Sequence, residues 1–375
     1  MSLSAQSIGG ITLGALSRLA RITLSAALLM GAFTAAADAQ QLRKITFLVP
    51  TTVISEAFSP FLVAKYMGYF KDEGLDVNLI ASGGSNASAI GVSSGAGDLG
   101  AASPAQSIVG MQDGTLDIKY VYDLYYGSIW ATSVMKDSPI KSFKELKGKK
   151  IGVTAMGSAG ITYGEALARE AGLDKTDVSF ISVGAGAQAM TSLRQGLVDA
   201  LIFSSEATAK FEVAGLPLRY LPMSGGFATF PDASIVAKQE MIAKEPKVIS
   251  GFARAVAKGY VFTMANPEAA VRISWKLVPE AEPKVGTPEE ILKGGIAVNL
   301  KRMEIWSSPE TNGVYGLFVA KSWDDLVTYL VDTGVLKQKV PTSRIFTNDF
   351  IKDANDFDRA AVQAQAKAFD LGKLK

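Results

Sequence analysis

Short apolar runs of strand length alternate with segments of helical period along most of this chain, and this alternation constrains the fold more than any other feature. The first set comprises four predicted strands, at residues 44–50, 75–81, 99–103 and 118–126. The segments between them have the period, the capping residues and the glycine stops of helices. Strands separated by helices at this spacing form a parallel sheet with helices on both faces. The sequence therefore predicts an α/β fold.

A second set of runs follows with the same rhythm. Its predicted strands lie at residues 150–156, 177–183, 199–205 and 218–223. A short amphipathic helix is expected before them, at 142–149. Beyond Pro231 the pattern changes to one extended strand at 233–242 and then to long helices, since the apolar residues from Val248 onward recur with helical spacing.

These two sets predict two lobes, each a sheet flanked by helices. The 375 residues are enough for two domains with sizeable cores. We expect residues 40–132 and 233–375 to form a discontinuous lobe one, and residues 133–232 to form lobe two. The chain would cross twice between the lobes, at 129–136 and 232–238, and these two crossing segments would act as the hinge.

The N-terminus has the features of an export signal. Arg18 and Arg21 precede an apolar run of small residues from Ile22 to Ala37, and Ala37-Asp38-Ala39 offers small residues at the two positions that a signal peptidase reads. We expect residues 1–39 to be a signal peptide cleaved after Ala39, so that the mature protein is exported. The alternative is an uncleaved anchor, for which the run is short.

The chain contains neither histidine nor cysteine, and this restricts its chemistry. A Ser-His-Asp triad, a Cys-His pair and a zinc site with imidazole or thiolate ligands are all excluded. Chemistry by Asp, Glu, Lys, Tyr or Ser remains open. The sequence favours a protein that is not an enzyme, with no catalytic residues, no metal and no cofactor. The net charge of +2 argues against nucleic acid as a partner.

Small and polar residues follow five of the predicted strands. In an open α/β sheet the ligand crevice lies outside the carboxyl ends of the strands, and helix N-termini there present free N–H groups. The residues of these loops that we expect to bind a ligand are Thr51, Thr52, Ser55, Gly83, Gly84, Ser85, Ala102, Ser103, Gly157, Ser158, Ala159, Ser204, Ser205 and Glu206.

Each of these loops also has a simpler interpretation, in which its small residues only permit tight packing and helix capping. Gly83-Gly84-Ser85 is not a phosphate-binding loop, because no Gly-Lys-Ser/Thr follows, and it lacks the spacing of a dinucleotide turn. Glu206 could merely complement a helix dipole, or it could bind an amino or ring N–H group of a ligand. Five such loops in two lobes favour a cleft for a small molecule.

Aromatic residues near the predicted hinge complete the candidate site. Tyr125, Tyr126 and Phe227 lie beside the chain crossings, where side chains can reach a cleft. Small-molecule pockets commonly have aromatic walls. Packing into the core is the alternative for each of the three residues.

Several motifs, taken in order, resemble the periplasmic substrate-binding proteins of ABC importers. They are "YMGYFKDEGLDVNLI", "GSNASAIGVSSGAGDLGAAS", "SFKELKGKKIGVTAMGSAG", "QGLVDALIFSSE" and "FTNDFIKDANDF". The group that they resemble binds nitrate, sulfonates, taurine and pyrimidine precursors of thiamine. This resemblance implies a type II periplasmic-binding-protein fold, a monomer that closes on a small solute, and a membrane permease with its ATPase subunit as partner.

The resemblance leaves the ligand open. The nitrate-binding branch has a cleft rich in Lys and His, whereas these loops contain no basic residue. The leading interpretation is a small organic anion, a sulfonate or carboxylate with an apolar or aromatic body. The alternatives are a thiamine-precursor pyrimidine or related heterocycle, a sensory ligand-binding module, and an enzyme like the pyrimidine-precursor synthases of this fold. Those synthases resemble iron- and histidine-dependent enzymes, which this chain without histidine does not match.

Overall fold

The computed structural model describes Met1 and residues 41–156, 158–223, 226 and 229–374. Apart from Met1, the predicted signal peptide and its cleavage site lie outside the described residues, and so do Gly157 and Phe227. The chain divides into two compact units, Met1–Arg43 and Lys44–Lys375. The rest of the description concerns the second unit.

The second unit contains two five-stranded sheets. The first sheet has the order β2-β1-β3-β10-β4. Its strands are β1 (Arg43–Val49), β2 (Leu75–Ala81), β3 (Leu99–Ala102), β4 (Ile118–Tyr122) and β10 (Ser234–Lys238). β1 and β3 are parallel, but β10 is antiparallel to both β3 and β4, so the sheet is mixed rather than purely parallel as predicted. β10 ends at Lys238, earlier than expected, because the chain turns there into a helix.

The second sheet has the order β7-β6-β8-β5-β9. Its strands are β5 (Trp130–Met135), β6 (Lys150–Val153), β7 (Ser179–Ser182), β8 (Ala200–Ser204) and β9 (Leu218–Tyr220). β6 is parallel to β7 and β8, whereas β5 is antiparallel to β8 and β9. The two segments predicted as the hinge are mostly strands. Segment 129–136 contains β5 of the second sheet, and segment 232–238 contains β10 of the first sheet. The chain crosses just before them, after Tyr122 and after Tyr220.

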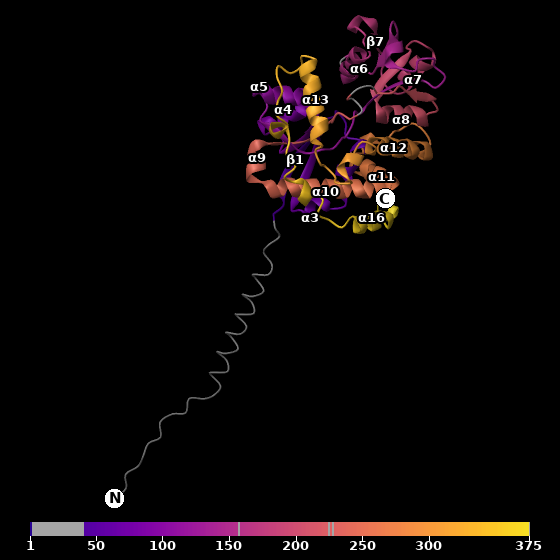
Figure 1. The fold of residues 1–375 in the computed structure, drawn as a ribbon. Helices are drawn as coiled ribbons and strands as arrows, with labels where there is room; N and C mark the ends of the chain where they lie inside the picture. The colour runs from indigo at the N-terminus through magenta and orange to yellow at the C-terminus, as the bar shows by residue number, and fades with distance from the viewer. Residues whose placement is uncertain (2–40, 157, 224–225, 227–228, 375) are drawn as a thin grey trace. The chain divides into compact units, whose positions relative to one another are not determined.

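We call the first sheet with its helices lobe one and the second sheet with its helices lobe two (Figure 1). The helices of lobe two are α6 (Ala159–Glu170), α7 (Ala187–Arg194) and α8 (Ser205–Val213), with 3-10 turns η2 (Phe143–Leu146) and η3 (Lys175–Asp177). The helix predicted at 142–149 is thus only the single turn η2.

Lobe one carries the remaining helices. Before the first crossing they are η1 (Glu56–Phe58), α2 (Ser59–Tyr66), α3 (Tyr69–Asp72), α4 (Ser85–Ser94) and α5 (Pro104–Asp113). After β10 they are α9 (Gln239–Lys244), α10 (Pro246–Ala265), α11 (Pro267–Leu277), η5 (Pro279–Ala281), α12 (Pro288–Met303), η6 (Pro309–Thr311), α13 (Ala320–Asp332), α14 (Thr342–Ile345), α15 (Ile351–Ala354), α16 (Arg359–Lys367) and η7 (Leu371–Leu374). The segment 55–74, whose helical period lies between the first two predicted strands, does not form one helix, because it is broken at Gly68, whose φ of 82° is left-handed.

The first sheet buries a separate core on each face, as strand alternation requires. Ile45, Phe47 and Val49 of β1 point into one core, and the intervening Leu48 points into the other. In the first core the Phe47 ring stacks on Phe61, with ring centroids 4.8 Å apart, and on Phe252 of α10 at 5.2 Å. The second sheet likewise packs a core on each face. Both sheets are thus rigid platforms for the loops at their strand ends.

α12 joins the two lobes. It packs on α11 and η1 of lobe one and also on α8 of lobe two, beside which it lies in Figure 1. Its start is fixed by a capping box, in which Thr287 and Glu290 exchange hydrogen bonds, and by Pro288 at the first helical position. The packing of α12 brings side chains from residues near 300 to the N-terminus of α8.

Candidate functional site

Asp232 ties the two crossing segments together. Its Oδ2 accepts a hydrogen bond from the backbone N–H of Ile129 at 3.2 Å, and its own N–H donates to the carbonyl of Tyr125 at 3.1 Å. Its Oδ1 accepts from the N–H of Ala233 at 2.8 Å. One carboxylate thus holds the two strand-to-strand passages side by side. The sequence pattern did not single out Asp232.

Two predicted site residues of lobe one meet at this junction. Ser103 Oγ donates to Asp232 Oδ1 at 3.0 Å and lies 3.0 Å from Ser85 Oγ. Ser85 Oγ also accepts the backbone N–H of Ser103 at 3.1 Å. Ser85 is the first residue of α4, and Ser103 is the cap of α5. The N-termini of both helices therefore point to the place where the chain crosses between lobes.

Lobe two contributes the start of α8. The backbone N–H of Ser205 donates to the carbonyl of Ile129 at 2.7 Å, which places α8 against the first crossing. Glu206, in the first turn of α8, forms an ion pair through Oε1 with Nη2 of Arg302 on α12. Arg302 was not predicted, because it lies 96 residues from Glu206 and its helix reads only as amphipathic.

Arg302 lies over the ring of Tyr125, with its Cζ 5.0 Å from the ring centroid. Trp306 meets the same ring edge-on, with centroids 5.9 Å apart. We define the Tyr125 cluster as Tyr125, Glu206, Asp232, Arg302 and Trp306. Tyr125 lies in the core of lobe one, among charged partners that the sequence did not reveal, and its contact with a ligand stays a prediction.

Within the Tyr125 cluster, Tyr125, Arg302 and Trp306 are buried, whereas Glu206 and Asp232 are half-buried, and this burial governs the electrostatics of the first two. Burial raises the pKa of the Tyr125 hydroxyl, an effect that the positive charge of Arg302 only partly offsets. Burial alone would lower the pKa of the Arg302 guanidinium, but Glu206 and the nearby Tyr125 and Asp232 hold that pKa above its ordinary value. Arg302 therefore stays positively charged, and Tyr125 stays a neutral hydroxyl.

A second ion pair connects the lobes one turn further along α8. Lys210 Nζ lies 3.4 Å from Oε1 of Glu56, a fully buried carboxylate at the start of η1. The other carboxylate oxygen of Glu56 accepts a hydrogen bond from Trp275 Nε1 at 3.3 Å. Asn299 Nδ2 donates to the Glu56 carbonyl at 2.9 Å, which ties η1 to α12. In one ion pair α8 contributes the acid, Glu206, to Arg302. In the other it contributes the base, Lys210, to Glu56.

The loops after β1 and β2 lie at the rim of lobe one. The backbone N–H of Gly83 donates to the carbonyl of Thr51 at 2.8 Å, so the two loops touch. Thr51 Oγ1 donates to the carbonyl of Val53 at 3.0 Å, and the neighbouring Thr52 is exposed. Ser55 caps η1, since its Oγ accepts the N–H of Ala57 at 3.4 Å. These residues remain predicted ligand contacts.

The side chains of two other predicted residues, Ala102 and Tyr126, make contacts within lobe one. The side chain of Ala102 is fully buried in the second core of lobe one, so only its backbone can face a cleft. The hydroxyl of Tyr126 donates to the carbonyl of Leu317 at 2.9 Å, in lobe one.

In lobe two, Ser158 caps α6 by accepting the N–H of Gly160 at 3.1 Å, and Ser204 ends β8 immediately before α8. The side chain of Ala159 is not described. Gly157 and Phe227, also predicted, lie outside the described residues, as noted for the fold.

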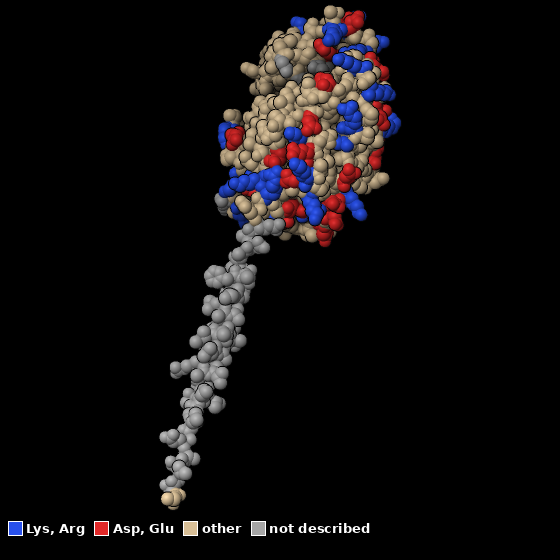
Figure 2. Space-filling model, turned by 90° about the vertical axis from the view of Figure 1, so that its left-hand side faces the viewer, with Lys and Arg blue, Asp and Glu red and all other residues tan. Residues whose placement is uncertain are grey.

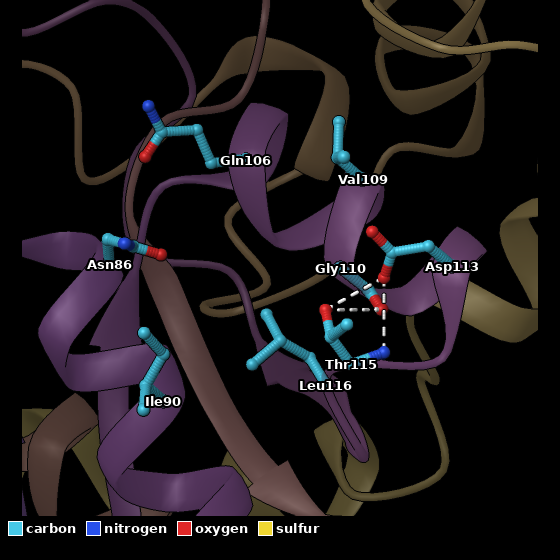
Figure 3. A pocket seen from close by; sticks show the side chains of 8 residues that line it. All are labelled: Asn86, Ile90, Gln106, Val109, Gly110, Asp113, Thr115 and Leu116. Atoms are coloured by element: carbon cyan, nitrogen blue, oxygen red, sulfur yellow. Dashed lines mark hydrogen bonds between the residues drawn. The ribbon is translucent and has the colours of Figure 1, made fainter.

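A pocket of about 410 Å³ lies between α4 and α5 of lobe one (Figure 3). Ile90, Val109 and Leu116 give it an apolar lining. Its carboxylate, Asp113, is turned onto Thr115, whose N–H and hydroxyl donate to Asp113 Oδ1 at 3.1 and 2.7 Å. Neither the predicted binding residues nor the residues of the Tyr125 cluster line this pocket.

The described part of the chain contains no group of three or more acidic side chains placed to hold a metal ion. Among the same residues, no helix is long and apolar enough to cross a membrane. On the face shown in Figure 2, lysine and arginine side chains are interspersed with aspartate and glutamate, without a large patch of one sign.

Comparison with known families gives a match over more than half of the chain. The description of the matching family is "NMT1/THI5 like", and the match covers residues 55–270. Arg302 and Trp306 lie beyond the matched segment. Family membership therefore does not by itself assign these two side chains a role.

Three curated relatives are each 23% identical to this chain. The riboflavin-binding protein RibY of Chloroflexus aurantiacus aligns over 78% of this chain and 82% of its own length. The formylaminopyrimidine-binding protein of Halalkalibacterium halodurans aligns over 76% and 84%. The 4-amino-5-hydroxymethyl-2-methylpyrimidine phosphate synthase of Legionella pneumophila aligns over 79% and 88%.

Among solved structures, the chain is similar to the periplasmic aliphatic sulphonate binding protein SsuA of Escherichia coli. The TM-score is 0.58 at 17% identity, and the match covers 82% of this chain and 92% of that one. This likeness confirms the two-lobed α/β fold expected from the alternation of strands and helices.

Proposed function

Because the chain belongs to the NMT1/THI5-like family and has the fold of periplasmic binding proteins, we propose that it is an extracytoplasmic solute-binding protein of an ABC importer. The observation that carries this proposal is the convergence at the chain crossings. Ser85 and Ser103 of lobe one are hydrogen-bonded to each other, and Ser103 is hydrogen-bonded to Asp232. Asp232 in turn donates its N–H to the carbonyl of Tyr125, over whose ring Arg302 pairs with Glu206 of lobe two. A solute held there would contact both lobes at once.

In this role the protein captures its solute after export and delivers it to a membrane permease with an ATPase subunit. The residues predicted to bind the solute are those of the loops at the strand ends, together with Tyr125. The signal peptide at residues 1–39, the periplasmic location and the monomeric state are parts of the same proposal. Closure of the two lobes about the crossings would retain the solute until it is released to the permease.

Two ligand classes fit this proposal. An organic anion, a sulfonate or a carboxylate, would use the N-termini of α4 and α5, where free N–H groups favour negative charge. An uncharged heterocycle is the second candidate, and the charges of the site favour it. Arg302 is already paired with Glu206, and Asp232 adds a further carboxylate nearby.

Catalysis is the competing function, since one relative is named as a synthase. The absence of histidine from the whole sequence argues against imidazole chemistry in this chain. Binding without turnover is therefore the function that we propose.

Native mass spectrometry of the mature protein, purified without denaturation, tests the proposal. We expect one small molecule to co-purify at a stoichiometry of one and to be released unchanged by denaturation. Small-angle scattering of the stripped protein should show compaction when that molecule is returned. Recovery of a chemically converted product would instead support an enzyme. Absence of any bound molecule, together with no response to a solute screen, would contradict the proposed function.

A further inference from the structure

Asp123 is a fully buried carboxyl group at the point where the chain leaves lobe one. It follows β4 directly, and its own N–H donates to the carbonyl of Gly316 at 2.9 Å. Its two oxygens accept hydrogen bonds from Ser234 Oγ at 2.7 Å and from Trp323 Nε1 at 3.2 Å. Ser234 is the first residue of β10, where the chain has just returned to lobe one. Asp123 therefore connects the ends of both crossings.

The surroundings of Asp123 leave its protonation state open. The ionisable side chains around it, from β4, the residues after β4 and, through Ser234, the residue before β10, are Tyr120, Tyr122, Tyr126 and Asp232. Burial raises the pKa of each of the three tyrosines, so they stay neutral. Arg359 of α16 lies over the ring of Tyr315 and acts on Tyr122, and no cation among the described residues is paired with Asp123.

Without a paired cation, the Asp123 carboxyl titrates near neutral pH. Burial raises its pKa to about 7, and the hydrogen bonds from Ser234 and Trp323 oppose this shift only in part. Histidine is the usual side chain for sensing pH in this range, but the chain has none. A buried carboxyl at the crossings can therefore take that role.

The hydroxyl of Ser234 has two acceptors and one hydrogen to donate. Its Oγ lies 2.7 Å from Asp123 Oδ1 and 3.2 Å from the backbone carbonyl oxygen of Asp232. An ionised Asp123 is the stronger acceptor, because charge-assisted hydrogen bonds are the stronger ones. A protonated Asp123 has an O–H of its own that can donate to Ser234 Oγ, which frees the serine hydrogen for the carbonyl of Asp232.

Asp232 carries this change to the candidate site. Its carboxylate accepts hydrogen bonds from the N–H of Ile129 at 3.2 Å and from Ser103 Oγ at 3.0 Å. The residue whose carbonyl gains or loses the hydrogen bond from Ser234 is thus the one that ties the two crossings together. An unbroken line of hydrogen bonds leads from Asp123 through Ser234 to Asp232.

We propose that Asp123 is a positioning residue that makes the junction between the lobes respond to protons. When its carboxyl is protonated, Ser234 donates to the carbonyl of Asp232 and fixes the second crossing. When the carboxyl ionises, Ser234 donates to Asp123 instead, and the crossing is held less tightly. The proposal rests on the proposed function in one consequence only: retention of a solute at the junction should weaken as the pH rises through neutrality.

Nuclear magnetic resonance of the purified, isotope-labelled protein tests the proton switch without a ligand. The indole N–H of Trp323 reports the Asp123 carboxyl, and the backbone nitrogen of Ala233, which shares a peptide bond with the Asp232 carbonyl, reports the hydrogen bond at that carbonyl. We expect both signals to shift with one common midpoint near pH 7. The indole of Trp275 is the internal control, because it donates to a different carboxylate and should not share this midpoint.

Two conservative variants separate the sensor from the link to Asp232. Asp123→Asn cannot ionise, so neither signal should titrate near pH 7. Ser234→Ala keeps the carboxyl but removes the hydroxyl, so the Trp323 indole should still titrate while the Ala233 signal becomes independent of pH. Ser274→Ala is the matched control, since Ser274 is equally buried but its hydroxyl donates to Ala270 within α11. It should leave both titrations unchanged.

The consequence for binding is measured on the molecule that co-purifies with the protein. We expect its dissociation constant to rise about three- to tenfold between about pH 6 and pH 8 in the wild type, within the tenfold per pH unit that one linked proton allows. The Ser234→Ala variant should show a flat profile over the same range. A flat profile in the wild type, despite both titrations, would overturn the link between the switch and binding.

The remaining outcomes separate this inference from the proposed function. A Trp323 indole that does not titrate near pH 7, or an Ala233 signal that titrates alike in the wild type and in Ser234→Ala, would overturn the inference and leave a solute-binding protein. Both titrations in a protein that binds no molecule would support the switch and contradict the proposed function. Loss of the Ala233 titration in Ser234→Ala alone, with Trp323 unaffected, would support the link through Ser234.

Discussion

At the scale of single residues, two aspartates hold the crossings: Asp232 is half-buried, Asp123 is fully buried, and each has a defined physical role. Asp232 links backbone groups of both passages, while Asp123 anchors the end of β4. Asp123 accepts hydrogen bonds from Ser234 Oγ at 2.7 Å and from Trp323 Nε1 at 3.2 Å. Neither aspartate lies in a recognisable motif. Their roles follow from the groups that surround them.

Asp123 should make stability depend on pH near neutrality. Burial raises the pKa of its carboxyl to about 7, although the hydrogen bonds from Ser234 and Trp323 oppose the shift. A pKa that is higher in the folded than in the unfolded state stabilises the fold at low pH, and that contribution is lost as pH rises through about 7. We expect the urea midpoint of the wild type to fall between about pH 4 and pH 7, where the folded state still holds the proton that the unfolded state has lost, and to level off above pH 7.

The matched variant for this prediction is Asp123→Asn, which cannot ionise. Its absolute stability should be lower, because one amide oxygen cannot replace two carboxylate oxygens as an acceptor. Its midpoint should nevertheless vary less with pH than that of the wild type. Parallel pH profiles for the two proteins would show that Asp123 does not titrate in this range.

Gly84 illustrates a residue whose substitution affects the fold as well as the cleft. As a predicted ligand contact, Gly84 would be expected to tolerate valine in the fold while the larger side chain blocks the cleft. The φ of Gly84 is 148°, in the region that favours glycine, and it precedes the first residue of α4. We therefore expect Gly84→Val to lower the free energy of unfolding by about 1–3 kcal/mol. Denaturant titration beside Gly84→Ala, which shares the backbone strain without the bulk, would separate strain from steric effects.

At the scale of elements, the helices fit each other through small residues at defined positions. Gly294 and Gly295 are neighbours in α12 with opposite surroundings. A Cβ on Gly295 would lie 2.5 Å from Trp275 and 2.8 Å from Val271 of α11, whereas a Cβ on Gly294 would meet nothing within 4 Å. The position of α12, and with it that of Arg302, depends on this close approach.

We expect the two alanine variants of α12 to change the stability of the protein in opposite directions. Gly294→Ala should stabilise the protein by about 0.5–1 kcal/mol, because alanine favours a helix over glycine. Gly295→Ala should destabilise it by about 1–3 kcal/mol through overpacking against Trp275. Thermal unfolding of both variants under one condition provides the comparison. Equal shifts in the same direction would mean that α11 and α12 do not pack as described.

The strands and helices themselves were largely predictable, because their periodicity is local. The errors have local reasons too. The helix expected at 142–149 is one 3-10 turn, and the helix at 55–74 is broken by Gly68. The antiparallel direction of β5 and β10 could not be read from their sequences, since an apolar run of strand length fits either direction.

At the scale of the whole molecule, two ion pairs of opposite polarity join α8 of lobe two to η1 and α12 of lobe one. Glu206 faces Arg302, and Lys210 faces the buried Glu56. Because Lys210 is the cation that neutralises the buried Glu56 among the described residues, separation of the lobes would leave this carboxylate to be compensated by water. These contacts should favour the arrangement in which the lobes are together.

Lys210→Glu should therefore shift the lobes apart. It places a second carboxylate opposite Glu56, whereas Lys210→Arg keeps the charge and serves as the control. The chain has no cysteine, so spin labels at Leu197→Cys in lobe two and Val335→Cys in lobe one, both exposed positions, are unambiguous. Double electron–electron resonance measures the distance between the two labels, and its distribution should be changed or broader in Lys210→Glu only. Identical distributions in all three proteins would contradict a role for this ion pair in lobe arrangement.

The sequence by itself determined the alternation of strands and helices, the two sheets, and the family to which the chain belongs. It also placed Ser85, Ser103, Tyr125 and Glu206 near strand ends or crossings, because loop position follows from local periodicity. Only the tertiary structure decided which charged side chains meet these residues. Arg302 and Trp306 reach Tyr125 because α12 packs between α11 and α8, and that packing depends on the shapes of distant side chains rather than on any local pattern.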